Sequence, residues 1–129
     1  MPTDRTPTNG RTGGWVKLYR KLMDWEWYQD SHMVHLFVHL LLSANSAPRK
    51  WKGILIERGQ YITTQRTLSD ATGISQPTIH RCLMRLVECG AILAKVNQRK
   101  TMITICNYDS YQDYEDRGES KTNSNVNQI

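Results

Sequence analysis

The segment from Leu68 to Ile79 constrains the fold more than any other part of the chain. It runs Leu-Ser-Asp-Ala-Thr-Gly-Ile-Ser-Gln-Pro-Thr-Ile. Ala71 is small enough to lie where two helices cross closely, and Gly73 accepts the left-handed conformation that ends a helix. Ile74 and Ile79 are spaced to fill the angle between two helices. This pattern predicts a tight helix-turn-helix.

The helices on either side of this turn carry their own start signals. Thr63 or Thr64 can cap a helix over residues 65–72, and Ser75 can cap the next helix over residues 76–88. The apolar stripe of the second helix is expected to comprise Ile79, Cys82, Leu83, Leu86 and Val87. Both helices are therefore amphipathic, with one face turned into a core.

Two further helices are expected ahead of this motif. Residues 15–22 predict a short amphipathic helix whose apolar face comprises Trp15, Leu18, Tyr19 and Leu22. Residues 32–44, capped by Asp30 or Ser31, are apolar over most of their circumference, which is typical of a central buried helix. The aromatic residues within 25–28 are expected in the core, and an exposed patch that docks a partner is the alternative.

Extended segments flank the helix-turn-helix on both sides. Residues 51–62 predict a short extended segment or hairpin, with Gly59 in its turn. Residues 91–96 and 101–106 are β-like runs, joined by a polar and basic connector over residues 97–100. We expect the last two runs to form a hairpin that follows the helix-turn-helix.

This order of elements is that of a winged helix-turn-helix, a mainly α fold with a small β-hairpin wing, in the α+β class. We assign the domain to residues 15–112, with residues 1–14 as a flexible N-terminal segment and residues 113–129 as a disordered polar tail or linker. The net charge is +5, and residues 1–112 hold fifteen basic and eight acidic side chains. A basic body of this kind suggests an anionic partner.

Several other classes of protein are not expected. The longest nearly unbroken apolar run, within residues 33–42, is far shorter than the roughly 20 residues that span a bilayer, and the N-terminus lacks the apolar segment of a signal peptide. Cys82, Cys89 and Cys106 lack C-x-x-C spacing, so we expect reduced thiols in a cytoplasmic protein.

No catalytic, metal or cofactor site is expected either. His35 and His39 have the spacing of a metalloprotease helix, but the residues between them lack the glutamate that would serve as the general base. Together with His32 they are expected to form the polar, solvent-facing side of an otherwise apolar helix. No cysteine has an evident base beside it, and there is no glycine-rich phosphate loop.

The helix over residues 76–88 is suited to the major groove of duplex DNA, which exposes base edges between two lines of negative charge. Because such helices contact bases mainly with their N-terminal residues, Gln76, Thr78 and Arg81 are the candidates for base contacts, and Arg85 is the candidate for phosphate. The other candidates for DNA binding are Thr64, Gln65, Ser75, His80, Lys95, Arg99 and Lys100. A merely solvated surface is the alternative for these charges.

A set of short motifs occurs in order along residues 13–112. It comprises Gly14–Leu22, Trp25–Tyr28, Leu36–Asn45, Lys52-Gly53, Arg58–Gln60, Thr72–Ser75 and Ile103–Gln112. As an ordered set they resemble the N-terminal winged-helix domain of DnaD-like replisome organisers, the replication initiation proteins of phages and prophages.

This resemblance implies binding at a phage or plasmid replication origin, self-association through the N-terminal helices and contacts with replication proteins, in the bacterial cytoplasm and at the nucleoid. In that family a polar linker leads to a C-terminal domain that engages DNA or the helicase-loading machinery. The chain stops at Ile129, inside what looks like that linker, so recruitment of a helicase loader is not expected of it. The alternatives are a winged-helix transcriptional regulator and a protein-interaction or oligomerisation module that does not bind DNA.

Overall fold

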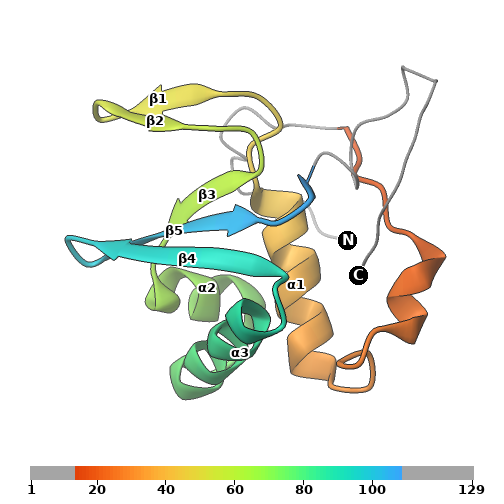
Figure 1. Ribbon diagram of the computed structural model, residues 1–129. Coiled ribbons are helices and arrows are strands. Elements are labelled where there is room, and N and C mark those ends of the chain that lie inside the picture. Colours follow the sequence, from red (N-terminus) through yellow and green to blue (C-terminus); the bar gives the residue numbers. More distant parts are fainter. Residues whose placement is uncertain (1–13, 109–129) are drawn as a thin grey trace, which may run out of the picture.

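The computed structural model describes residues 14–108, in which a helical layer lies beneath two small antiparallel sheets (Figure 1). The elements in chain order are η1 (Arg20–Asp24), α1 (Ser31–Ser43), β1 (Arg49–Trp51), β2 (Ile54–Ile56), β3 (Gln60–Thr63), α2 (Gln65–Thr72), α3 (Gln76–Glu88), β4 (Ile92–Asn97) and β5 (Lys100–Ile105). The expected winged helix-turn-helix architecture is confirmed. The flexible segment and the disordered tail expected at the two ends lie outside the described residues, apart from Gly14.

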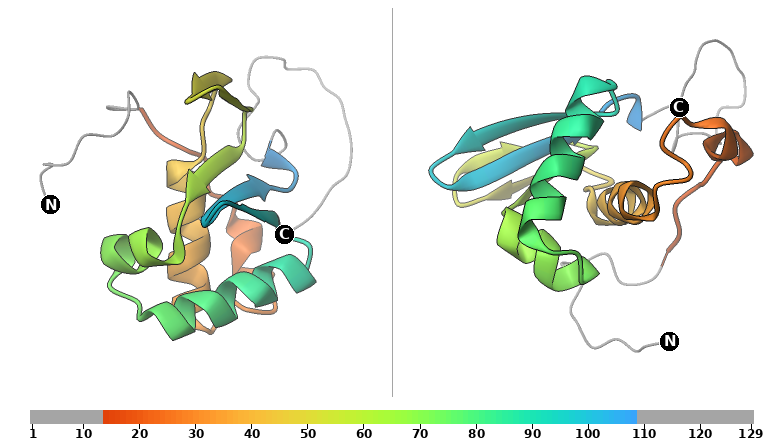
Figure 2. Two further views of the ribbon diagram at one scale, coloured as in Figure 1. Left: turned by 90° about the vertical axis from the view of Figure 1, so that its left-hand side faces the viewer. Right: turned by 90° about the horizontal axis from the view of Figure 1, so that it is seen from below.

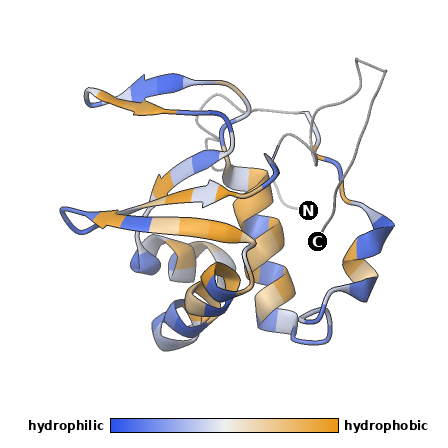
Figure 3. Ribbon diagram, viewed as in Figure 1, coloured by the Kyte–Doolittle hydropathy of each residue, from blue (hydrophilic) through white to orange (hydrophobic). Residues whose placement is uncertain are grey.

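Helix α1 occupies the centre of the domain, as its all-round apolar character predicts. Its buried side chains are Met33, Leu36, Phe37, Leu40 and Leu41, each at most 1% exposed. The helix begins where expected, because the Asp30 carboxylate accepts the backbone N–H groups of His32 and Met33 at 3.1 and 3.2 Å. Figure 3 shows that α1 is apolar over much of its length and lies beside apolar stretches of the strands and of α3.

The wing sheet has the strand order β3-β5-β4, with both pairs antiparallel. Its inner face is apolar: Ile103 and Ile105 of β5 and Ile92 of β4 are buried in the same cluster as the residues of α1. The outer face of β4 is exposed, as Leu93 shows, and the inner face leaves the core toward the tip, where Val96 is 73% exposed. The sheet therefore covers the helices on one side and meets solvent on the other.

The hairpin expected over residues 51–62 is placed differently in the structure. Strands β1 and β2 form it, and the chain reverses at Lys52-Gly53, whose φ angles are 50° and 79°. These angles belong to a two-residue turn of the type that matches the twist of a hairpin. Gly59 lies in the next turn and leads into β3, which joins the wing sheet instead.

The prediction of an amphipathic helix over residues 15–22 is wrong. Only Arg20–Asp24 are helical, as a 3₁₀ helix, and Leu22 is its buried residue. Trp15, Leu18 and Tyr19 are 79%, 54% and 50% exposed. A helix of about two turns is marginal without packing, and only Leu22 reaches the core to provide it.

The helix-turn-helix itself follows the sequence closely, with two corrections. Thr64 caps α2, and Gly73 ends it with a φ of 80°. Ala71 is exposed rather than at the helix crossing, which Leu68 fills from α2. Val87 is 39% exposed, because the buried stripe of α3 already ends one residue earlier.

Ser75 precedes α3 as expected but caps it only by position. Its hydroxyl donates to Thr78 Oγ1 at 3.0 Å, and no backbone N–H of α3 donates to it. Ile74 in the turn and Ile79 in α3 are buried, as their spacing predicts. Apolar contacts therefore fill the angle between α2 and α3.

Gly59→Ala tests the close approach of the chain at the start of β3. A Cβ at Gly59 would lie 2.8 Å from Tyr108 Cβ at a φ of +83°, whereas Gly53 has a φ of +79° and nothing within 4 Å. We expect Gly53→Ala to lower the free energy of unfolding by about 1 kcal/mol from backbone strain alone. Gly59→Ala should lose a further 1–3 kcal/mol or so through overpacking. Equal losses in urea denaturation would contradict the clash.

Candidate nucleic-acid interface

Helix α3 presents a polar face away from the core. In the view from below it crosses in front of the other elements (Figure 2). Ile79, Cys82, Leu83 and Leu86 are buried on its inner side. Its exposed side chains include Gln76, His80, Arg81 and Met84. An amide, an imidazole and a guanidinium therefore lie on the outer face, within reach of a ligand that approaches from outside.

Two of the expected base-contacting residues are available for such a ligand. Gln76 and Arg81 lie in the N-terminal half of α3 and are exposed. Within residues 14–108 neither side chain takes part in a hydrogen bond or an ion pair. Thr78 is half-buried, and its hydroxyl accepts from Ser75. Of the predicted trio, Gln76 and Arg81 thus have free polar groups.

The first turn of α2 is connected to α3 by a hydrogen bond between side chains. Gln65 Nε2 donates to His80 Nδ1 at 3.0 Å. This hydrogen bond occupies Nδ1 of His80 and leaves Nε2, at the other side of the ring, for a phosphate oxygen or a base. The Thr64 hydroxyl is already engaged by Thr67, from which it accepts a backbone N–H and to which it donates, both at 3.0 Å. A phosphate contact by Thr64 would have to compete with that cap.

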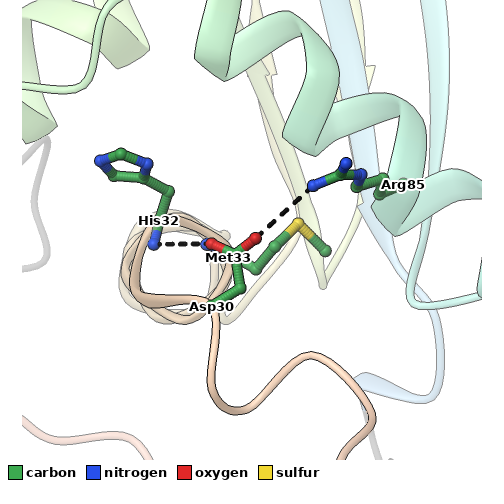
Figure 4. A network of polar contacts seen from close by, with 4 residues as sticks. All are labelled: Asp30, His32, Met33 and Arg85. Atoms are coloured by element: carbon green, nitrogen blue, oxygen red, sulfur yellow. Dashed lines mark hydrogen bonds and ion pairs between the residues drawn. The ribbon is translucent and has the colours of Figure 1, made fainter.

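Arg85 does not point outward as expected. Its Nη1 lies 3.5 Å from Asp30 Oδ2, and its guanidinium lies 4.8 Å from the centre of the Trp27 ring (Figure 4). Both partners precede α1 in the chain, and together they draw the side chain across the inner flank of α3. The expectation of its direction is wrong for that reason, and its contact with phosphate stays a prediction.

The three candidates on the wing are exposed at or near its tip. The turn between β4 and β5 has φ angles of 54° at Gln98 and 72° at Arg99, so Arg99 stands at the tip itself. Lys95 lies further down β4, opposite Met102. The ammonium of Lys100 lies 5.5 Å from the centre of the Trp51 ring. The wing therefore brings three positive charges to one end of the domain.

Sequence reasoning missed the β1–β2 hairpin as part of this surface. Trp51 also has the ammonium of Lys52 at 5.0 Å from its ring centre, so lysines from two different hairpins share one indole. The signal was present as a run of basic residues around an aromatic one, Arg49-Lys50-Trp51-Lys52.

The residues set aside as unlikely catalysts or ligands lie as follows. His32 and His35 are exposed on α1, and His39 pairs with Ser43 at 3.3 Å. Residues 14–108 contain no group of three or more His, Cys, Asp or Glu that could hold a metal ion. Nor does any helix there have the length and apolar character needed to cross a membrane.

Cys82 and Cys106 are poor nucleophiles. Burial raises the pKa of the Cys82 thiol, and the negative charge of Asp30 raises it further. Burial also raises the pKa of Cys106, with a smaller contribution from Cys89. The two thiols are therefore less ionised near neutral pH than free cysteine, and it is the thiolate that reacts.

Comparison with known proteins addresses the helix-turn-helix directly. Residues 60–92 match the family model of winged helix-turn-helix DNA-binding domains. The fold is a winged helix-turn-helix. The matched segment runs from β3 to the first residue of β4 and includes α2, its turn and all of α3. It supports a DNA-binding domain with duplex DNA as its partner. No curated protein matches the chain, and no solved structure does.

Asp30 has two roles that can be separated by mutation. Asp30→Ala removes the oxygen that caps α1 and should lower the free energy of unfolding by about 1 kcal/mol. Asp30→Asn keeps a capping oxygen and loses only the charge that faces Arg85. Both side chains of that ion pair are about a third exposed, so the loss should be about 0.5 kcal/mol or less. Equal losses in urea denaturation would show that the charge, and not the cap, stabilises this end of α1.

Proposed function

We propose that this protein binds double-stranded DNA with a sequence preference and acts in the initiation of phage or plasmid replication. The observation that carries the DNA-binding part is the outer face of α3, where Gln76 and Arg81 are exposed with free polar groups. The family match over residues 60–92 supports the same part. The replication role rests on the resemblance to DnaD-like replisome organisers over residues 13–112.

The proposed mechanism is non-catalytic. Helix α3 enters the major groove, where Arg81 pairs with a guanine and Gln76 with an adenine. Gln65, His80 and the wing residues neutralise or hydrogen-bond the phosphates on either side, which fixes the register of α3 on the duplex. Affinity then comes mainly from charge neutralisation, and sequence preference from the N-terminal half of α3.

The exposed apolar residues in the segment around η1 support self-association as part of this proposal. Trp15, Leu18, Tyr19 and Met23 are all at least half exposed in the segment around η1. Side chains of this kind, gathered in one stretch of chain, are typical of a protein–protein contact. Sedimentation velocity over a range of concentrations measures this directly, and a monomer at every concentration would contradict it.

A winged-helix transcriptional regulator would have the same fold, so the DNA sequence decides between the two. Selection of bound sequences from random duplexes, followed by their location in the genome of origin, separates them. Repeated sites at a replication origin support our proposal, whereas sites at the promoter of the protein's own gene support a regulator. If no duplex is bound at low salt by fluorescence anisotropy, the DNA-binding proposal fails.

Arg81→Ala tests direct base contact. We expect a loss of about 1–3 kcal/mol in binding to the selected site, and a relaxed preference at one base position. Arg20→Ala is the matched control, because it removes the same charge from an exposed position in η1, away from α3. Anisotropy titrations against single-base variants of the site measure the effect. A loss that is the same for every sequence would contradict a base contact.

Arg99→Gly tests the wing. The φ of 72° at Arg99 favours glycine, so the substitution removes the charge and eases the turn. We expect binding to weaken alike for all sequences, and the slope of log K against log salt to become shallower by about 1. A slope that stays unchanged would show that the wing tip does not touch phosphate.

A further inference from the structure

The β1–β2 hairpin is an addition to the helix-turn-helix, and neither the family match nor the mechanism above uses it. It lies outside residues 60–92 and forms a two-stranded sheet of its own. Ile56 is its buried residue, and the other side chains of its strands are exposed or half-buried. A projection of this kind adds little to the core, so its residues are available for another purpose.

One aromatic ring of the hairpin, that of Trp51, also meets a lysine of the wing. The ammonium of Lys52, in the turn of the hairpin, lies 5.0 Å from the centre of the Trp51 ring. The ammonium of Lys100, at the base of the wing turn, lies 5.5 Å from the same centre. An indole attracts each cation, but it does not neutralise either of them. Two like charges from separate hairpins therefore share one indole.

Neither hairpin carries a carboxylate of its own to balance these charges. The hairpin carries Arg49, Lys50 and Lys52, and residues 44–56 contain no Asp or Glu. The wing carries Lys95, Arg99 and Lys100, and residues 91–108 contain no Asp or Glu either. Both hairpins are thus purely cationic in their charged side chains, in a domain where other surfaces have mixed charge.

The two hairpin tips project toward the same side of the molecule, and α3 lies along the lower edge of that side. Both turns project in one direction in Figure 1, and in the left view of Figure 2 they point toward the viewer above α3. In that view α3 lies lowest, the wing tip is in the middle and the β1–β2 hairpin is uppermost. A duplex bound by α3 and the wing would continue toward the hairpin.

We propose that the β1–β2 hairpin is a second DNA-contacting arm, which binds the phosphate backbone beside the wing. A phosphate near Trp51 would supply the negative charge that Lys52 and Lys100 lack, since the indole attracts both ammonium groups without neutralising them. Arg49 and Lys50 add charge along β1. This inference rests on the proposed function and extends it, because the arm lengthens the footprint on DNA without adding base contacts.

The test removes charge from the arm without damaging its turn. Lys52 has a φ of 50°, and Asn followed by Gly53 is a favoured pair for this turn, so Lys52→Asn should fold at least as well as the wild type. The double variant adds Lys50→Gln. The pair Arg20→Gln and Lys21→Gln is the matched control, since it removes two positive charges from exposed positions in η1. Circular dichroism and urea denaturation verify that each variant folds.

Binding is measured on two duplexes, one limited to the selected site and one extended at each end by about one helical turn. On the extended duplex we expect the double variant to bind several-fold more weakly, with a salt slope that is shallower by about 1–2. On the short duplex it should match the wild type, and hydroxyl-radical footprinting should show one flank of the protected region shortened.

The outcomes separate this inference from the proposed function. If the double variant binds the extended duplex with the slope and footprint of the wild type, the arm does not contact DNA, and the function proposed for α3 still stands. If it loses as much on the short duplex as on the long one, the arm acts inside the α3 site and not beside it, which also overturns the inference. If the wild type binds neither duplex, both proposals fail.

Discussion

The burial of one broad apolar face of α1 is the constraint on which the rest of the structure depends. Met33, Leu36, Phe37 and Leu40 expose almost nothing, so this face has to be covered along its whole length. Part of that cover comes from the wing sheet, part from the helix-turn-helix and part from Leu22, Trp25 and Trp27 ahead of α1. All three contribute to one apolar cluster. The face of α3 that remains outside is therefore fixed by what α1 needs inside.

The parts of the fold that the sequence predicts are those whose signals are local. A threonine ahead of α2 and a glycine behind it mark both ends of that helix, since a cap and a left-handed turn depend on single residues. Tertiary contacts decide the rest. The apolar spacing of residues 15–22 is helical, yet those side chains find too little to pack against, and most of them stay in solvent.

The candidate site likewise contains residues whose position the sequence predicts and residues whose position depends on long-range contacts. Gln76 and Arg81 lie on the outer face of α3 as helical periodicity predicts, because nothing else competes for them within residues 14–108. Arg85 obeys the same periodicity but lies against Asp30 and Trp27, more than fifty residues earlier in the chain. The meeting of Lys52 and Lys100 at Trp51 is also long-range, so no window of sequence contains it.

The thiol of Cys82 can report how often α3 detaches from the core. It lies in the buried stripe of α3, only 1% exposed, on the side opposite the groups that would meet DNA. A thiol reagent reaches it only when α3 separates from α1 and the sheet, so the rate of its modification measures how often the helix detaches. Cys89 and Cys106, which are half-buried, serve as references in the same molecule. The rate at which α3 detaches can thus be measured by thiol modification of the wild-type protein, with and without DNA.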